Sequence, residues 1–304
     1  MSLFQRILAF ADPARIAAGD PTASPPIEAA EAKAISLYLR SDRTPHFSPG
    51  YSKYKERLVL EALTDTELMA TFRDGRPLPD GFGAKLDERI VEYPWIFSRL
   101  PKEGNIFDAG STLNKEVLIK SPYLNERELI IYTLWMDRIA MYPNVSFLLG
   151  DLRNIILRDN VIDTLVCIST LEHVGYTYEY KTYSKSNPWP NAEPDSYLDA
   201  IREFSRIVKP GGHFLLTIPF GKYERHGWLQ QFDSKRIDAV EAAFGGKRCQ
   251  RLFYRYVDGA WRVATEEECA DLEYFNIHET GKFDPDGAAA ARAVCCLDLE
   301  KTAG

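Results

Sequence analysis

The pattern of hydrophobic and polar residues changes near residue 100. Before that point, apolar residues recur at helical spacing, which predicts helices over about 27–39 and 54–72. Proline and glycine are frequent between and after these stretches, as in loops. From Gly104 onward, short apolar runs alternate with amphipathic stretches, the pattern of strands alternating with helices. We therefore predict a helical extension and lid over residues 1–100 and an α/β domain over 101–304.

The second region contains enough strand-like runs for one large sheet. Strands are predicted over residues 105–107, 129–134, 145–149, 161–168, 214–218, 252–257 and 293–299. Helices are predicted over 113–119 and 196–209; the second has capping-box spacing at Ser196 and Asp199 and stops at Pro210. The predicted fold is α/β: a doubly wound, mostly parallel, seven-stranded Rossmann-like sheet with an N-terminal helical extension.

The run from 161 to 168 has the clearest functional signal. Seven of its eight residues are apolar or Thr, as expected for a parallel strand covered on both faces. Ser169, Thr170, Glu172 and His173 follow at once. Because open α/β sheets bind ligands outside the carboxyl ends of their strands, we expect these four side chains to lie at a binding site.

Composition narrows the classes of function. The net charge of −7, from 37 basic and 44 acidic residues, gives no field that would attract a nucleic acid backbone. No apolar stretch approaches the roughly 18 residues of a membrane span, and no secretion signal is visible. The five cysteines form no CxxC pair, so no metal site is expected. We expect a cytoplasmic protein without nucleic acid or membrane partners.

Four segments in order resemble the class I S-adenosylmethionine-dependent methyltransferases. They are Ile-Phe-Asp-Ala-Gly at 106–110, Leu-Gly-Asp-Leu at 149–152, Ile-Ser-Thr-Leu-Glu-His-Val at 168–174, and Arg-Ile-Val-Lys-Pro-Gly-Gly-His-Phe at 206–214. The resemblance spans roughly residues 104–300 and implies S-adenosyl-L-methionine as cofactor. It places the cofactor against the ends of the first four strands, with these binding residues: Asp108, Gly110, Ser111, Thr112, Asn114, Thr133, Asp151, Leu152, Ser169 and Thr170.

Two features depart from the family pattern. Thr112 stands where the family usually has a second glycine, and the second strand ends without an acid for the ribose hydroxyls, the next acid being Asp137. A non-catalytic methyltransferase-like binding module and another Rossmann-type enzyme that uses an adenine nucleotide therefore remain alternatives. A nicotinamide enzyme is disfavoured, because the loop after the first strand lacks the Gly-x-Gly-x-x-Gly fingerprint.

The acceptor of the methyl group is expected on the other side of the cofactor. His173, beside Glu172, has the chemistry of a general base, although the pair could instead hold the loop. An aromatic insertion at about 174–196 and a polar loop at 219–227 add candidates for acceptor binding, as does the stretch before the first strand: Tyr93, Tyr176, Tyr178, Tyr223, Arg225 and His226. The expected acceptor is a hydroxyl or amine of a small molecule, a sugar or glycan precursor being one example. A homodimer is left open.

Overall fold

The computed structural model describes residues 29–43, 47–135, 142–176, 193–281, 284–288 and 290–302, and it falls into two compact units. Unit 1 is drawn from Met1–Ser98, Tyr256–Val263 and Phe275–Ala290. Unit 2 is drawn from Arg99–Arg255, Ala264–Tyr274 and Ala291–Gly304. The division expected at about residue 100 stays a prediction, since unit 1 also takes two segments from the second half of the chain.

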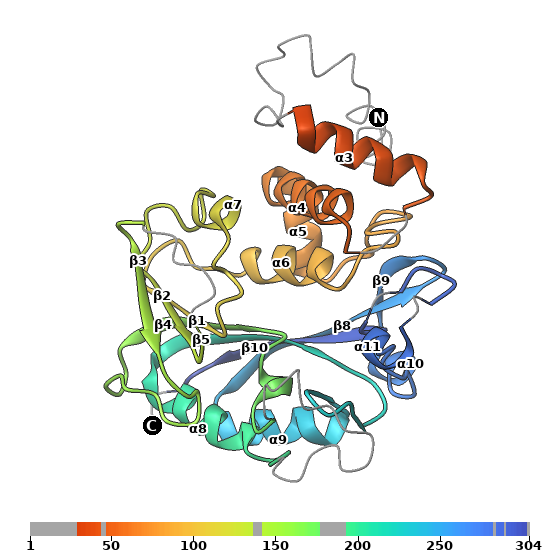
Figure 1. The fold of residues 1–304 in the computed structure, drawn as a ribbon. Helices are drawn as coiled ribbons and strands as arrows, with labels where there is room; N and C mark the ends of the chain where they lie inside the picture. Colours follow the sequence, from red (N-terminus) through yellow and green to blue (C-terminus); the bar gives the residue numbers. More distant parts are fainter. Residues whose placement is uncertain are drawn as a thin grey trace. The chain divides into compact units, whose positions relative to one another are not determined.

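Unit 1 is mainly helical (Figure 1). Its elements are α3 (Ala29–Arg40), α4 (Pro49–Thr64), α5 (Thr66–Asp74), α6 (Arg89–Phe97), most of β9 (Ala260–Ala264) and α11 (Ile277–Thr280). The single helix predicted over 54–72 is wrong, because Asp65 ends α4 and caps α5. Its carboxylate accepts hydrogen bonds from the backbone N–H groups of Glu67 and Leu68, both at 3.0 Å. A short polar residue inside a helical pattern therefore starts a new helix here.

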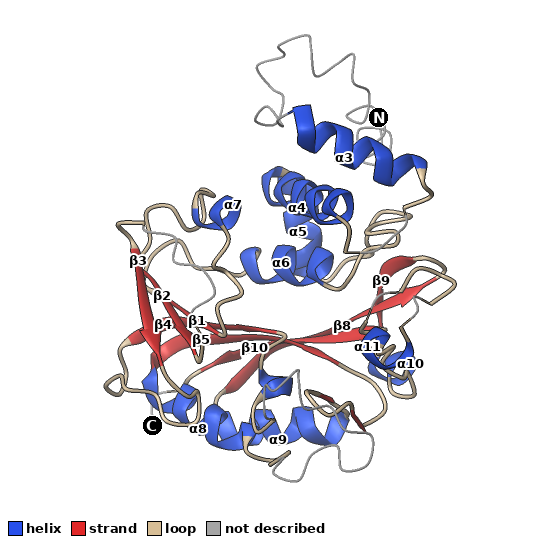
Figure 2. Cartoon of the chain, viewed as in Figure 1, coloured by secondary structure: helices blue, strands red, loops and turns tan. Residues whose placement is uncertain are grey.

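Unit 2 is built on a twisted sheet whose strands Figure 2 shows in red. The strands are β1 (Ile106–Ala109), β2 (Leu129–Thr133), β3 (Val145–Leu149), β4 (Ile162–Ile168), β5 (Val208–Pro219), β8 (Lys247–Val257) and β10 (Ala293–Glu300). Their order is β3-β2-β1-β4-β5-β10-β8, with β9 next to the end of β8. The first five run parallel, whereas β10 is antiparallel to both of its neighbours. The predicted Rossmann-like, mostly parallel sheet is confirmed, but with β9 it has eight strands among the described residues and not the seven predicted.

Two helices cover one face of this sheet, α8 (Tyr197–Ile207) and α9 (Ser234–Phe244), which lie side by side in Figure 1. Buried residues of both helices form one hydrophobic cluster with alternate residues of β5 and β10, among them Phe204, Phe214 and Leu297. Ser196 precedes α8 but makes no side-chain capping bond, so the capping box inferred there is wrong. The amphipathic pattern of α8 was sufficient to predict the helix without it.

The strand order reverses between β1 and β4, and this reversal marks the expected ligand site. From β1 the chain builds outward through β2 to β3, whereas β4 and β5 lie on the other side. In sheets of this kind, ligands bind at the carboxyl ends of the strands next to such a reversal, here β1 and β4. Short elements follow these strands: α7 (Glu116–Ile119) comes after β1 and η1 (Leu171–His173) comes after β4. After β5 come β6 (Glu224–Arg225) and β7 (Gln230–Gln231), and α10 (Glu266–Cys269) precedes β10.

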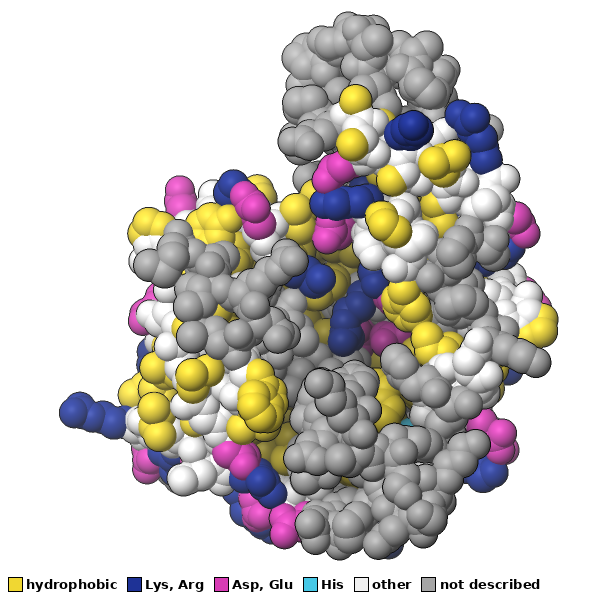
Figure 3. All heavy atoms as spheres, in the orientation of Figure 1, with side chains coloured by type: hydrophobic (Ala, Val, Ile, Leu, Met, Phe, Trp, Pro, Cys, Tyr) yellow, Lys and Arg dark blue, Asp and Glu magenta, His cyan; other side chains and the backbone are white. Residues whose placement is uncertain are grey.

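Helix length and surface charge bear on the location expected from the composition. No helix in the described part of the chain is both long and apolar enough to cross a membrane. Among the described residues of the face in Figure 3, Lys and Arg side chains are interspersed with Asp and Glu. The cytoplasmic location expected from the sequence stays a prediction.

Candidate functional site

Asp108 organises the loop that follows β1. It is fully buried, and its carboxylate accepts hydrogen bonds from the Thr112 backbone (3.3 Å), the Thr112 hydroxyl (3.0 Å) and the Leu113 backbone (2.7 Å). Burial raises the pKa of Asp108 to about 6 although these bonds act in the opposite direction. The helix predicted over 113–119 begins only at Glu116, because the loop N–H groups bond to Asp108. The buried carboxylate of Asp108 therefore fixes the conformation of the loop through these hydrogen bonds.

Gly110 brings this loop against the end of β4. Its φ is +111°, and a Cβ atom there would lie within 2.8 Å of three atoms of the Thr170 side chain. Ser111 and Ser169 also have positive φ, +66° and +37°, which is uncommon for residues other than glycine. Strained backbone of this kind is concentrated at functional sites. The predicted cofactor residues Gly110, Ser111, Ser169 and Thr170 thus meet at the reversal of strand order.

The ends of β2 and β3 are arranged differently. Asp151 follows β3 and pairs with Arg153 through its Nε (3.0 and 3.1 Å) and Nη2 (2.7 Å) atoms. This ion pair lowers the pKa of Asp151. Arg153 also pairs with Glu193 at 3.1 Å. Leu152 is buried in the core, so only its backbone remains for a ligand. Sequence reasoning missed Arg153, although a basic residue two positions after Asp151 was a visible signal.

Large apolar side chains are exposed at the same two strand ends. Leu134 and Trp135, just after β2, are 56% and 63% exposed, and Leu149 at the end of β3 is 52% exposed. Thr133 accepts and donates hydrogen bonds locally with the Trp135 backbone, at 3.4 and 3.0 Å. Asp137, the acid considered for the ribose, lies outside the described residues. Exposed apolar surface beside a strand end suits the face of a ligand ring.

His173 is held by a residue that the sequence did not single out. Its Nδ1 lies 2.9 Å from the backbone carbonyl oxygen of Trp228, and the two rings stack with centroids 4.9 Å apart. Because a carbonyl only accepts, Nδ1 carries the proton in the neutral ring and Nε2 carries the lone pair. The buried carboxyl of Glu172 places Oε1 3.9 Å from Nε2. Trp228 lies one residue beyond the loop considered, and a backbone carbonyl leaves no sequence signal.

The predicted acceptor loops meet next to His173. The Arg225 guanidinium lies 5.9 Å from the centre of the Tyr176 ring, so the loops after β4 and β5 are in contact. Tyr223 instead stacks under Arg236 at 3.1 Å, and its hydroxyl lies 3.5 Å from Gln230 Oε1. His226 packs against Tyr274 with ring centroids 5.0 Å apart. Within unit 2 the structure thus brings Tyr176 and Arg225 together.

Four predicted residues are placed differently or not described. Asn114 is half-buried in the loop that follows β1, and Thr112 gives its hydroxyl proton to Asp108. Tyr93 is buried in α6 of unit 1. Tyr178 lies outside the described residues, as does most of the aromatic insertion. Their binding roles stay predictions.

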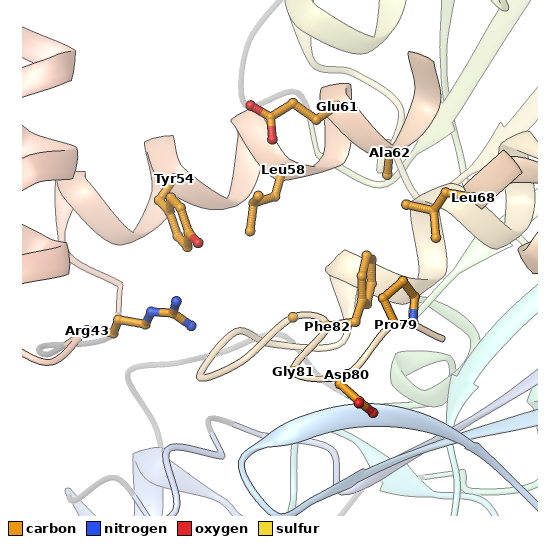
Figure 4. A pocket seen from close by; sticks show the side chains of 11 residues that line it. Arg43, Tyr54, Leu58, Glu61, Ala62, Leu68, Pro79, Asp80, Gly81 and Phe82 are labelled. Atoms are coloured by element: carbon orange, nitrogen blue, oxygen red, sulfur yellow. The ribbon is translucent and has the colours of Figure 1, made fainter. Parts of the chain in front are cut away.

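Unit 1 has a pocket of its own, seen in Figure 4. Side chains such as Tyr54, Leu58 and Phe82 line it, with Arg43 at one end. Its volume is about 30 Å³, room for one or two water molecules, and therefore too small for a nucleoside cofactor. The pocket at the helices of unit 1 is not the candidate site.

The residues at the strand ends of unit 2 fit S-adenosylmethionine. Gly110 lets the loop backbone pack against Thr170, and Ser111 follows it directly in the loop. Asp151 can accept only, which suits the exocyclic amino group of adenine. Three N–H groups of Arg153, its backbone N–H among them, already donate to this carboxylate, so an adenine amino group would compete with Arg153 for it.

Comparisons with solved structures and curated proteins were made over the chain's whole length. Three solved structures are similar: the YcgJ protein of Bacillus subtilis (14% identity, TM-score 0.42, covering 68% of this chain and 95% of that one), an S-adenosylmethionine-dependent methyltransferase of Mesorhizobium loti (10%, 0.44, 69% and 97%), and one of Methanosarcina mazei (12%, 0.44, 69% and 99%). No curated protein matched the chain.

The family comparison gives the assignment. Residues 134–216, which hold β3, β4, α8 and most of β5, match the family model described as a methyltransferase domain. This segment includes Asp151, the polar residues at the end of β4 and His173. The expected cofactor and enzyme class are thereby confirmed. The matched segment is a methyltransferase domain, the class of enzyme that the motifs in the sequence resembled.

Proposed function

We propose that this methyltransferase acts on a hydroxyl or amine of a small molecule and that His173 is its general base. The observation that carries the proposal is the contact between His173 Nδ1 and the Trp228 carbonyl, 2.9 Å long. It assigns the lone pair to Nε2 and, together with the stacked indole, fixes the plane of the ring. A base of fixed tautomer and orientation can accept a proton from an acceptor held in line with the methyl group.

Glu172 is proposed to support this base electrostatically. At 3.9 Å, its Oε1 is too distant for a hydrogen bond to Nε2, but an ionised carboxylate there stabilises the imidazolium that forms when His173 accepts the proton. Glu172 is only 2% exposed, so little solvent screens the interaction. The pair thus acts as a base with a nearby counter-charge.

The cofactor is proposed to bind across the ends of β1, β3 and β4. When bound, S-adenosylmethionine supplies an electrophilic methyl group on a sulfonium. The loop at Gly110 and Ser111 would contact its amino acid part, the half nearest Thr170. Asp151 would accept from the adenine amino group, and Trp135 is available beside it. Ser169 and Thr170 would then lie between cofactor and acceptor.

Tyr176, Arg225 and Trp228 support a small, hydroxylated or planar acceptor. An aromatic ring, a guanidinium and an indole converge beside His173, and such groups bind sugar rings, flat rings or anionic substituents. The net charge of −7 argues against a nucleic acid substrate. A sugar or glycan precursor is therefore the first acceptor class to test, with no partner other than the small molecule and a homodimer as an open alternative.

The test separates cofactor binding from proton transfer. Binding of S-adenosylhomocysteine is measured by titration calorimetry. Transfer of a labelled methyl group is measured by scintillation and mass spectrometry in a whole-cell extract separated into small-molecule, protein and nucleic acid fractions. His173→Gln should reduce turnover by about 10²- to 10⁴-fold and leave cofactor affinity within about twofold. Arg202→Gln, at the exposed surface of α8, is the control.

Two results would overturn the proposal. Unchanged turnover in His173→Gln would make the histidine part of the scaffold. Exclusive labelling of nucleic acid or protein would refute the small-molecule acceptor. If the lost group is a base, a raised pH should partly restore turnover in the variant. A larger fraction of the acceptor hydroxyl or amine is then deprotonated without the help of His173.

A further inference from the structure

Side chains that could bind a metal are clustered in unit 2, on the three neighbouring strands β5, β10 and β8. His213 Nδ1 lies 2.8 Å from Asp298 Oδ1. The ligand atoms of His213, Asp298 and Cys249 all lie within 4.8 Å of one another. Glu300 is not one of these three, but its Oε2 is 3.8 Å from Cys249 Sγ, so rotation of its side chain could add a fourth donor. An imidazole, a thiol and two carboxyl groups from distant parts of the sequence are thus gathered at one place.

A β-bulge is responsible for the position of Cys249. In the pairing of β10 with β8, Asp298 is opposite Gln250, whereas Leu299 is opposite Arg248, so Cys249 is the additional residue. Without the bulge, strict alternation would place Cys249 on the opposite face from Gln250 and Asp298. The bulge turns it toward the face of His213 and Asp298. All five cysteines are described, and the other four are buried. Cys249 is the exposed thiol of the chain.

The side chains of β5 and β10 reach the same place by ordinary alternation. Glu300 is directly opposite His213, and Asp298 precedes Glu300 by two residues, so all three lie on one face. The cluster is partly accessible: the side chain of His213 is 33% exposed and that of Asp298 is 12% exposed. An ion could reach it from solvent without passing through the hydrophobic core, whose residues lie on the alternate positions of these strands.

The set of donors is that of a borderline-soft divalent metal. Cys sulfur, His nitrogen and carboxylate oxygen are all ligands of Zn²⁺, which favours four of them in a tetrahedron. Bond lengths of about 2.0–2.3 Å place neighbouring donors roughly 3.5 Å apart. The His213 to Asp298 distance would open slightly and the thiol would move inward, both within reach of side-chain rotation. Mg²⁺ and Ca²⁺ are disfavoured, because they select oxygen donors only.

The local charges favour a cation. With the thiol ionised and His213 neutral, Cys249, Asp298 and Glu300 contribute three negative charges. Among their neighbours, Lys247 precedes the bulge and Arg248 projects to the other face, where it pairs with Glu241 at 3.2 Å. Burial and the two carboxylates raise the pKa of Cys249, and the hydrogen bond to Asp298 raises that of His213, so a metal competes with protons at both groups. Metal binding would release them.

We propose that His213, Cys249, Asp298 and Glu300 form a structural site for a divalent transition metal, Zn²⁺ in the first place. His213 is six residues before Pro219 on β5, about 20 Å along the strand from its carboxyl end. The site is therefore remote from the cofactor residues. Four protein ligands leave no open position for substrate, which is the arrangement of structural zinc. The ion would connect β5, β10 and β8, which are otherwise joined by antiparallel pairing.

The experiment uses the full-length protein without an affinity tag, stripped of metal by a chelator. Zn²⁺ is titrated against a chromophoric zinc chelator, and Co²⁺ is added to a second sample for absorption spectroscopy. We expect one equivalent of Zn²⁺ and, with Co²⁺, a thiolate-to-metal charge-transfer band in the near ultraviolet. Thermal unfolding should shift upward with Zn²⁺, as for any ligand of the folded state.

Matched variants identify the ligands. Cys249→Ser should abolish the charge-transfer band and reduce zinc affinity at least tenfold, whereas Glu300→Gln should weaken affinity and keep the band. Asp238→Asn removes a carboxylate that pairs with Arg251 and lies outside the cluster, and it should change nothing in the titration. Far-ultraviolet circular dichroism verifies that each variant is folded, and S-adenosylhomocysteine affinity should be the same in all of them.

The proposal is overturned if the folded wild-type protein does not compete with the chelator. It is also overturned if zinc affinity is equal in the wild type, Cys249→Ser and His213→Gln, because the ion then binds elsewhere. Either result leaves the methyltransferase assignment intact, since the measurements do not depend on methyl transfer.

Discussion

The two halves of the cofactor edge are constructed in opposite ways. At the ends of β1 and β4, side chains are buried, the backbone is strained, and Gly110 leaves no room for another atom beside Thr170. At the ends of β2 and β3, apolar side chains are exposed, and Asp151 is held by an arginine two residues away. The first half is held by contacts within the protein, whereas in the second Asp151 would exchange Arg153 for the adenine amino group if the cofactor binds as proposed.

The difference follows from the position of the strands. β1 and β4 are central and are paired on both sides, so their ends are fixed by neighbours. β3 is the edge strand, is paired with β2 alone, and is only half-buried along its length. Edge strands have fewer contacts to hold their loops. A binding site that spans both halves therefore combines a rigid part, which orients the reacting group, with a more adaptable part.

The largest expected effect is at Gly110. Gly110→Ala should weaken S-adenosylhomocysteine binding by at least about 100-fold, because the new Cβ atom meets Thr170 and the residue must keep a positive φ. Gly211→Ala is the matched control, since its φ is +78° and nothing lies within 4 Å of the added atom. Calorimetry on the two variants separates the clash from the cost of the backbone conformation.

A second substitution tests the contact itself. If the clash with Thr170 is the cause, Gly110→Ala combined with Thr170→Gly should recover part of the affinity beyond the sum of the single effects. Strict additivity in this double-mutant cycle would show that the two loops are energetically independent, and the rigid half would lose its physical explanation.

The next effect in size concerns Asp108. Asp108→Ala removes the acceptor of three hydrogen bonds and leaves two buried backbone N–H groups without it, so the free energy of unfolding should fall by about 3 kcal/mol. Urea unfolding followed by circular dichroism measures the change. A loss below about 0.5 kcal/mol would show that the loop does not depend on this carboxylate.

The same residue predicts a dependence on pH. Its pKa in the folded protein is about 6, above the 3.8 of the free group, so the folded state binds the proton more tightly than the unfolded state. The contribution of Asp108 to stability is therefore greatest below about pH 4 and decreases as the pH rises to about 6. Asp108→Asn should remove this part of the slope in unfolding experiments performed across that range.

At the adaptable half, Asp151→Asn should weaken cofactor binding by about 10- to 100-fold, the effect of losing a charge-assisted hydrogen bond of about 1.5–3 kcal/mol. The protein should remain folded, because Asp151 is half-exposed and its bonds are local. Calorimetry and thermal unfolding distinguish the two quantities. Equal affinity in the variant would move the adenine site away from β3.

The smallest effect is expected at Arg153, and its sign is informative. Arg153→Ala frees Asp151 from an exposed ion pair and should tighten cofactor binding by up to about fivefold, in line with the roughly 1 kcal/mol such pairs are worth at most. Glu193→Gln, which removes only the second partner of Arg153, is the control. Weaker binding in Arg153→Ala would instead make the arginine part of the cofactor site.

The central sheet could be predicted closely because its signal is local. The strand predicted over 161–168 corresponds to β4, Ile162–Ile168, and the helix over 196–209 to α8, Tyr197–Ile207. A strand that is buried on both faces, such as β4, has a continuous apolar run. A helix with one buried face, such as α8, has apolar residues at helical spacing. Failures occurred where a single polar side chain redirects the backbone, as Asp65 does between two helices and Asp108 does before α7.

The candidate site was less predictable, since contacts within it are made by atoms without a sequence signature. The order of the motifs gave the strand ends and their polar residues. The carbonyl that orients His173 belongs to the backbone of Trp228, and any residue would provide one. The His213 and Cys249 cluster depends on a one-residue bulge in β8, which no periodicity marks. Such features require the pairing of strands to be known.

The close approach of Gly110 to Thr170 also limits how this enzyme can be recombined. A chimera that imports the loop after β1 from another methyltransferase would bring a residue matched to a different neighbour at the end of β4. Exchange of either loop alone should then give a folded sheet with an obstructed ligand edge, whereas exchange of both as a pair should be tolerated. The two loops therefore have to be exchanged together, although some 60 residues separate them in the chain.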